Sequence, residues 1–238
     1  MKFITRKLGQ ISRTTPERTA QRAHLKAAKK FDRDNYLALA ANYTQLANLY
    51  FGSTVCEPAE LRITRVEQVF AGLWLGLQYA ERLSDFEYML TIALLDNTPE
   101  AHNIHSIEPL LIKLRKLDPA ARLALIAYEL QGWQIGRLAL IMRMRKPALH
   151  QLLSQARCAL CGIEWELLAQ EEKNCLQSIS EALDCKPNLR ANRELSQRVS
   201  QFPRVSEIRA EWLALRPQFV EIRYRYEPSH EARETMLK

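Results

Sequence analysis

The side chains of this chain best suited to binding chemistry gather between positions 143 and 157. They are three cations in a short polar turn and four polar side chains on the helix predicted to follow it. The cations are Arg143, Arg145 and Lys146, and the helix side chains are His150, Gln151, Gln155 and Arg157. Guanidinium and ammonium groups bind phosphate oxygens, and amide or imidazole groups hydrogen-bond to base edges. The set therefore predicts contact with DNA.

Three predicted helices must position these side chains. Asp118 can cap the first helix at Pro119, and Gly132 ends it. Its predicted buried face consists of Leu123, Ile126, Ala127 and Leu130. The second helix carries Leu138, Ala139 and Met142, and the third, opened by Pro147, buries Leu149, Leu153 and Ala156. A small residue at the helix crossing and a tight basic turn are typical of a DNA-binding helix-turn-helix.

The same stretch resembles region 4 of bacterial RNA polymerase sigma factors of the extracytoplasmic-function type. The family's order of apolar, proline, arginine, glycine and small residues is matched without a gap. The matching positions are Leu117, Pro119, Arg122, 123–130, Gly132, Leu138-Ala139, Ala156-Arg157 and Ala159-Leu160. Leu152 and Gln155 stand where relatives often carry arginines. The resemblance thus implies a weaker phosphate grip from this helix, which the cations of the turn would offset.

A second resemblance, to region 2 of the same family, lies upstream. Its docking helix, which binds the clamp of the polymerase β′ subunit, is matched by Glu67, Gln68, Val69, Phe70, Leu73 and Trp74. The helix after it is matched by Asp85-Phe86, Met89-Leu90 and Ile92-Ala93. A single preceding helix is predicted from the spacing of Tyr36, Leu39, Ala40, Tyr43, Leu46 and Tyr50.

The two resemblances imply an alternative sigma factor with three partners. Core RNA polymerase would bind through Glu67, Gln68, Phe70 and Trp74. Promoter DNA would bind through the helix-turn-helix, and an anti-sigma factor is a further candidate partner.

Region 2 departs from the family at its DNA-facing end. Thr64 replaces an expected acid, and Thr91 and Leu94 replace expected arginines. Asp96 and Glu100 then add negative charge, and Pro99 stops the helix where relatives continue into a basic segment. A second hypothesis therefore stays open, in which a sigma-like adaptor or regulator binds polymerase, DNA or another sigma factor without melting promoters.

Composition predicts a soluble, all-α protein. Of 238 residues, 47% are hydrophobic and 26% charged, and only 7 are glycine. Apolar residues recur every three to four positions, and extended β-alternation is nearly absent. No window approaches eighteen uninterrupted apolar residues, so no membrane span is predicted. Because the first residues also lack the apolar core of a secretory signal, we expect a cytoplasmic location.

The basic charge is concentrated at the start of the chain. The formal net charge is +7 and the sequence pI about 9.2. Residues 1–30 carry nine cations and one acid, Glu17; the cations are Lys2, Arg6, Lys7, Arg13, Arg18, Arg22, Lys26, Lys29 and Lys30. This basic arm could lie along DNA phosphates or be a solvated tail. An organellar transit peptide has a similar composition, but the bacterial-type motifs downstream disfavour it.

The sequence predicts neither an enzyme nor a cofactor. It contains no GxGxxG, Walker or GxSxG motif, and its five histidines form no HExxH pattern. Cys158 and Cys161 have the spacing of half a zinc site, but no second close pair completes it. We expect no metal, and a redox switch at this pair is the alternative. His102 and His105 lie in a predicted linker.

Five segments follow from these patterns. They are a basic arm at 1–30, a region 2-like domain at 31–98, a linker at 99–112, a region 4-like helix-turn-helix domain at 113–162 and a C-terminal extension at 163–238. The extension shows helical spacing at 192–199 and 205–215. Residues 219–226 fit a strand or a helix, and the extension could be a packing element or a regulatory lid.

Overall fold

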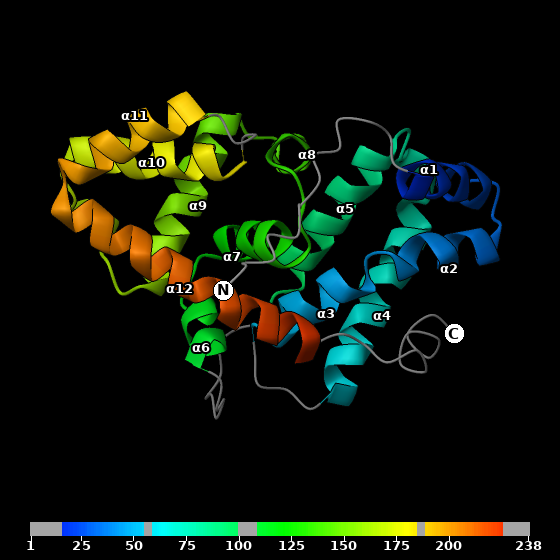
Figure 1. Cartoon of the computed structure of the whole chain (residues 1–238). Coiled ribbons are helices and arrows are strands. Elements are labelled where there is room, and N and C mark those ends of the chain that lie inside the picture. The colour runs from blue at the N-terminus through cyan, green and yellow to red at the C-terminus, as the bar shows by residue number, and fades with distance from the viewer. Residues whose placement is uncertain (1–15, 55–58, 100–108, 185–188, 226–238) are drawn as a thin grey trace.

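The computed structural model describes residues 16–54, 59–99, 109–184 and 189–225 (Figure 1). Every regular element in these ranges is helical, which confirms the predicted all-α class. Within the same ranges, no helix is both long and apolar enough to cross a membrane.

The first half of the chain forms five α-helices. They are α1 (Pro16–Ala28), α2 (Arg33–Ala41), α3 (Thr44–Gly52), α4 (Ala59–Gly76) and α5 (Leu83–Asp96), with a short 3₁₀ turn η1 (Leu77–Tyr79) after α4. Helix α1 packs on α2 and α5, so the described part of the basic arm is a docked helix. It is not a solvated tail.

The single helix predicted from Tyr36 to Tyr50 is wrong, because α2 and α3 divide it. The Asn42 side chain donates to the Ala38 carbonyl at 2.7 Å, and the Tyr43 N–H donates to the Ala40 carbonyl at 2.8 Å. Polar side chains that bond to nearby backbone compete with the helical ladder and favour such breaks. The break places Tyr43 at the start of α3, where its ring turns into the core.

The second half forms helices over the stretch for which the sequence predicts a helix-turn-helix. Its elements are α6 (Pro109–Arg115), α7 (Pro119–Leu125), a π-helical turn η2 (Ile126–Leu130), α8 (Ile135–Ile141) and α9 (Lys146–Leu160). Asp118 accepts hydrogen bonds from the N–H groups of Ala120 (2.9 Å) and Ala121 (3.4 Å), as an N-cap does. Gly132 has φ of 64°, a left-handed conformation that glycine adopts without strain. The predicted start and end of the first helix are therefore confirmed.

The C-terminal extension is helical throughout its described part. It consists of a 3₁₀ turn η3 (Trp165–Leu167), α10 (Gln170–Asp184), α11 (Leu189–Ser200) and α12 (Pro203–Arg225). Helix α12 continues through Pro217 to Arg225. The sequence left residues 219–226 open between strand and helix, and the described part of this range is helical. A small core joins this module to α9. It contains Cys158, Leu168, Cys175, Leu176, Ile179, Val199, Val205, Ile208 and Trp212.

A second, larger core contains residues from both sides of the segment predicted as a linker. It includes Phe86 and Leu94 of α5 together with Leu123 and Leu138 from the helix-turn-helix. Helix α5 packs directly against α7 and α8. Residues 100–108 lie outside the described ranges, so the domain boundaries stay a prediction. The two halves nevertheless share one buried core in this structure.

Candidate nucleic-acid interface

The turn between α8 and α9 presents the predicted cations. Arg143 has φ of 53°, an uncommon left-handed conformation for a residue other than glycine. The Met144 N–H donates to the Ala139 carbonyl at 2.9 Å and closes the turn. The Arg143 guanidinium lies 3.8 Å from the centre of the Tyr88 ring of α5, a cation–π contact that holds the turn against α5.

The first turn of α9 is open to solvent. Arg145, Lys146, Pro147 and Gln151 are all exposed. No side chain caps the N-terminus of α9, so its first backbone N–H groups add partial positive charge beside these cations. A helix-turn-helix inserts this end of its second helix into the major groove. The exposed cations and amide thus lie where phosphate and base contacts are made in that motif.

His150 and Arg157 are buried, which contradicts their predicted place on the open face of α9. Arg157 donates to the Glu129 carboxylate at 2.6 Å and to the Ser180 hydroxyl at 3.0 Å. His150 Nδ1 lies 3.4 Å from the same hydroxyl oxygen. Both side chains are therefore occupied inside the protein.

The C-terminal extension is the reason for this burial. Helices α10 and α12 pack on the side of α9 that the sequence predicted to face DNA. The Gln177 side chain of α10 donates to the Pro147 carbonyl at 3.3 Å, close to the first turn of α9. Gln155 is half-buried on the same helix. Of the four predicted helix side chains, only Gln151 is exposed.

The predicted polymerase-docking residues on α4 also divide between core and surface. Phe70, predicted as a polymerase contact, is buried in the core, which is not consistent with direct contact in this conformation, and its carbonyl accepts the Tyr36 hydroxyl. Trp74 is half-buried, with its ring centre 4.8 Å from that of Tyr36 and 6.3 Å from that of Phe31. These aromatic side chains attach α4 to α2. The helical spacing of hydrophobic residues on α4 accounts for Phe70 and Trp74 as packing residues, with no need for polymerase contact.

The exposed face of α4 is formed by other residues. Gln68 is exposed and Glu67 half-buried, as docking residues can be. Beside Gln68 lie Ala71, Gly72 and Leu75, and the Leu75 side chain is 78% exposed. Sequence reasoning missed Leu75, although its spacing of seven from Gln68 places both on one helix face.

Arg122, which the family resemblance includes, has a structural role here. Its Nε donates to the Leu114 carbonyl at 3.0 Å, and its Nη2 donates to the Arg115 and Leu117 carbonyls at 3.1 Å and 3.0 Å. The Leu114 and Arg115 carbonyls belong to the last turn of α6, and the Leu117 carbonyl follows it. Carbonyls at a helix end lack their usual intrahelical partners. Arg122 thus caps α6 and joins it to α7.

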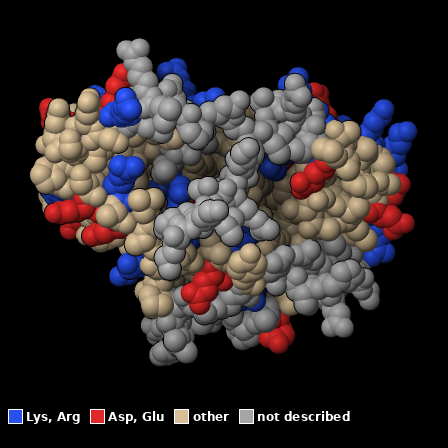
Figure 2. Space-filling model, in the orientation of Figure 1, with Lys and Arg blue, Asp and Glu red and all other residues tan. Residues whose placement is uncertain are grey.

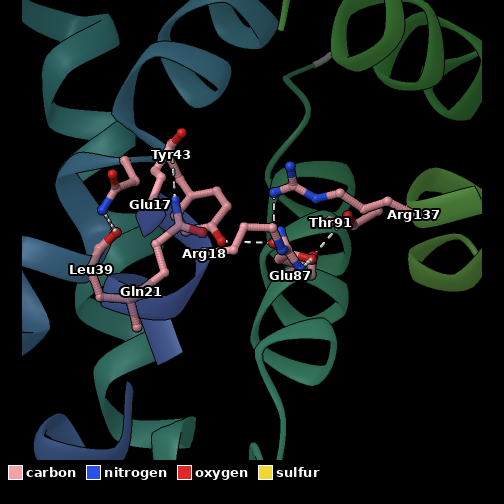
Figure 3. A network of polar contacts seen from close by, with 9 residues as sticks. Glu17, Arg18, Gln21, Leu39, Tyr43, Glu87, Thr91 and Arg137 are labelled. Atoms are coloured by element: carbon pink, nitrogen blue, oxygen red, sulfur yellow. Dashed lines mark hydrogen bonds and ion pairs between the residues drawn. The ribbon is translucent and has the colours of Figure 1, made fainter. Parts of the chain in front are cut away.

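A buried carboxylate connects the helix-turn-helix to the first half of the chain. Glu87 of α5 has no exposed side-chain surface and accepts from Arg18 of α1 at 2.7 Å and from Arg137 of α8 at 2.6 Å. Figure 3 shows these two arginines reaching Glu87 from opposite sides. Tyr43 also donates to Glu87 at 2.8 Å. Burial and the Glu87 charge raise the pKa of Tyr43, which keeps its hydroxyl protonated as a donor.

Sequence reasoning missed Glu87, although a signal was present. Glu87 falls in the apolar stripe of α5 at helical spacing from Leu83, Leu90 and Leu94, all of them buried. A carboxylate at such a position requires cationic or hydrogen-bonding partners. Nothing in the sequence alone identified Arg18 and Arg137 as those partners.

Of the cysteine pair at the end of α9, Cys158 is buried and Cys161 is half-buried. Burial raises the pKa of both Cys158 and Cys161 to about 12, which keeps both thiols protonated near neutral pH. Among the described residues, no group of three or more metal-binding side chains is present. His102 and His105 lie outside the described residues. The environment of Cys158 and Cys161 does not favour thiolate chemistry.

Comparison with known proteins identifies no relative of this chain. The chain matches no family model, no curated protein and no solved structure. The resemblance to sigma factors therefore rests on the residues of the chain itself.

Proposed function

We propose that this chain is a divergent sigma-like factor that binds promoter DNA through its helix-turn-helix and acts with core RNA polymerase. The observation that carries the proposal is the exposed first turn of α9. It presents Arg145, Lys146 and Gln151 at the end of the helix that enters the major groove in this motif. A cytoplasmic location and regulation by an anti-sigma factor belong to the same proposal.

Polymerase docking is assigned within this proposal to the exposed face of α4. Phe70 is excluded from the docking set by its burial, and Trp74 is largely engaged with α2. Gln68, Ala71 and Leu75 remain as the contact residues for the β′ clamp, with Glu67 at their edge. Exposed apolar residues surrounded by polar ones are suited to a protein interface.

DNA binding is tested by removing the cations of the first turn. We expect Arg145→Ala with Lys146→Ala to weaken binding to duplex DNA and to lower the salt slope by about 0.9 per lost phosphate contact. The matched control is Arg204→Ala with Arg216→Ala, which removes two exposed cations from α12. Equal affinities and slopes in the first variant and the wild type would contradict the DNA-binding role.

Polymerase docking is tested by a pull-down of core enzyme. We expect Leu75→Glu to abolish capture, because it places an unpaired charge inside the proposed contact. Leu167→Glu is the control, since Leu167 is 67% exposed and lies on η3, in the C-terminal extension. Failure of the wild-type chain to capture core polymerase would exclude the sigma-type role.

A sigma-like regulator that does not melt promoters is the second candidate. Helix α5 ends at Asp96, before a basic DNA-facing segment could form, and the Glu87–Arg137 ion pair attaches α5 to α8. Runoff transcription in a reconstitution with core polymerase distinguishes the two candidates. Transcripts that require this chain support the sigma factor, and their absence despite polymerase binding supports the regulator.

A further inference from the structure

Helix α1 carries a row of cations on one side. Arg22, Lys26 and Lys30 are exposed and follow one another at intervals of four residues, with Lys30 just beyond the last helical residue. Residues four apart lie on neighbouring positions of a helix surface, about 6 Å apart along its axis. The opposite side of α1 is buried against the protein through Gln21, Leu25 and Ala28. The row is therefore a basic edge rather than an evenly charged surface.

The direction of this basic edge is set by Arg18. Arg18 precedes Arg22 in the same row, and its side chain turns toward Glu87 (Figure 3). Glu87 also binds Arg137 of α8, so the side of α1 that carries Arg18 is the side toward the helix-turn-helix. The later cations of the row continue along α1 from that point.

The cations of the α8–α9 turn border the same helix, α5. Arg143 lies over the ring of Tyr88, the residue after Glu87, and Arg145 and Lys146 follow it in the turn. Lys and Arg side chains also project from the right-hand edge in Figure 2, where Figure 1 places α1 and α2, with Asp and Glu side chains below them. Two groups of cations thus flank α5, one from each half of the chain.

Acidic side chains near these groups are partly engaged in local contacts. Asp85 accepts from the N–H groups of Glu81 (3.1 Å) and Arg82 (2.8 Å) at the start of α5. Asp32, just after α1, accepts from the N–H of Asn35 at 3.1 Å and caps α2. The hydrogen bonds to Asn35 lower the pKa of Asp32. These carboxylates bind backbone at helix ends and leave the cations of α1 available to an external polyanion.

We infer that α1 is a second contact for the DNA backbone, beside the duplex segment read by α9. Arg22, Lys26 and Lys30 span about 12 Å of helix axis, which matches roughly three to four phosphates on one strand. The partner is double-helical DNA, and the contact is with phosphate rather than with bases. This inference rests on the proposed DNA binding of the helix-turn-helix and extends its footprint.

The first experiment measures how the affinity for a fluorescent DNA duplex of about 40 base pairs depends on salt concentration. The test variant is Arg22→Gln, Lys26→Gln and Lys30→Gln in the full chain. The control variant is Arg204→Gln, Arg216→Gln and Arg223→Gln on α12, all exposed. Each set removes three positive charges, from +7 to +4, so net charge is matched. Glutamine has a helix propensity close to those of lysine and arginine.

We expect the α1 variant to lower the magnitude of the salt slope by about 2 to 3, at 0.9 per lost phosphate contact, and the α12 control to retain the wild-type slope. Equal slopes for the two variants would overturn the inference and leave the helix-turn-helix contact intact. A wild-type chain that does not bind the duplex would instead contradict the proposed function.

Photocross-linking provides a second readout that does not depend on affinity. A photoreactive group is attached to Lys26→Cys or, as the control, to Ala20→Cys, an exposed position on another face of α1. We expect position 26 to cross-link to the duplex at least several times more efficiently than position 20, above the background from the native cysteines. Equal cross-linking from the two positions would overturn the inference.

Discussion

Helices α4 and α9 both carry side chains predicted from the sequence as partner contacts, and the structure buries part of the predicted contact set in each. On α4 the buried side chain is aromatic, Phe70, and it belongs to a continuous apolar core. On α9 the buried side chains are polar, His150 and Arg157, and they meet polar partners from other elements. The surfaces that remain open are Gln68 with Leu75 on α4, and the first turn of α9.

This contrast between Phe70 and Arg157 limits how far a helical pattern can identify a contact residue. Phe70 falls on the hydrophobic stripe of α4, so its burial requires no information beyond the spacing. Arg157 falls on the polar side of α9 and is buried only because η2 and α10 supply Glu129 and Ser180. A polar face is thus compatible with solvent, with DNA or with another polar helix.

The largest effect in this comparison is expected at Phe70. We expect Phe70→Ala to lower the free energy of unfolding by about 3 to 5 kcal/mol, because the cavity lies in the fully packed core. Urea unfolding measures it, with Gln68→Ala on the exposed side of α4 as the control. A loss below about 1 kcal/mol would mean that Phe70 is not a core residue and could serve docking after all.

A somewhat smaller loss is expected at Arg157. We expect Arg157→Ala to cost about 2 to 3 kcal/mol, because Glu129 keeps a nearly buried charge without its partner, partly relieved by its 13% exposed side chain. A second variant, Arg157→Met with Glu129→Gln, should recover part of the loss by removing both charges. If Arg157→Ala weakens DNA binding while leaving stability unchanged, the buried position of Arg157 is wrong.

Substitutions in the exposed first turns of α9 should affect DNA binding rather than stability, unlike Arg157→Ala near the buried C-terminal end. We expect Gln151→Ala to leave stability within about 0.5 kcal/mol of the wild type and to change discrimination between related promoter sequences by about 1 kcal/mol. Competition between labelled and unlabelled duplexes measures this preference. Unchanged preferences in the variant would exclude a base contact from Gln151.

The smallest effect is expected at Cys158, on the covered end of α9. Burial raises its pKa to about 12, so the folded state retains the thiol proton that the unfolded chain loses above pH 9. This contribution is complete below pH 9 and is lost as the pH rises toward 12. Near pH 9.5 we expect a loss of under about 1 kcal/mol. Unfolding curves of the wild type and of Cys158→Ala at pH 8 and pH 9.5 test it, and identical pH dependence in both would contradict the buried thiol.

Much of the architecture could be predicted from local chemistry. The Asp118 cap, Pro119 at the first helical position and the positive φ of Gly132 define the first helix of the motif. The buried stripe of Leu149, Leu153 and Ala156 is confirmed as well. Each of these features depends on residues within one or two helical turns.

The features that could not be predicted all involve residues distant in sequence. Glu87 meets Arg18 and Arg137 across 69 and 50 positions, and Arg157 meets Glu129 across 28. The division of α2 from α3 depends partly on a local side-chain bond, but the core position of Tyr43 depends on Phe86 and Trp133. Spacing along one helix contains no information about these partners.

The helical class, several helix ends and the buried apolar stripes all follow from the sequence, because they depend on short-range backbone and hydrophobic patterns. Which polar side chains remain available to a partner depends on the tertiary packing. A charged or amide group can be satisfied by water, by DNA or by another helix, and the packing of α10 and α12 on α9 determines which of these it meets.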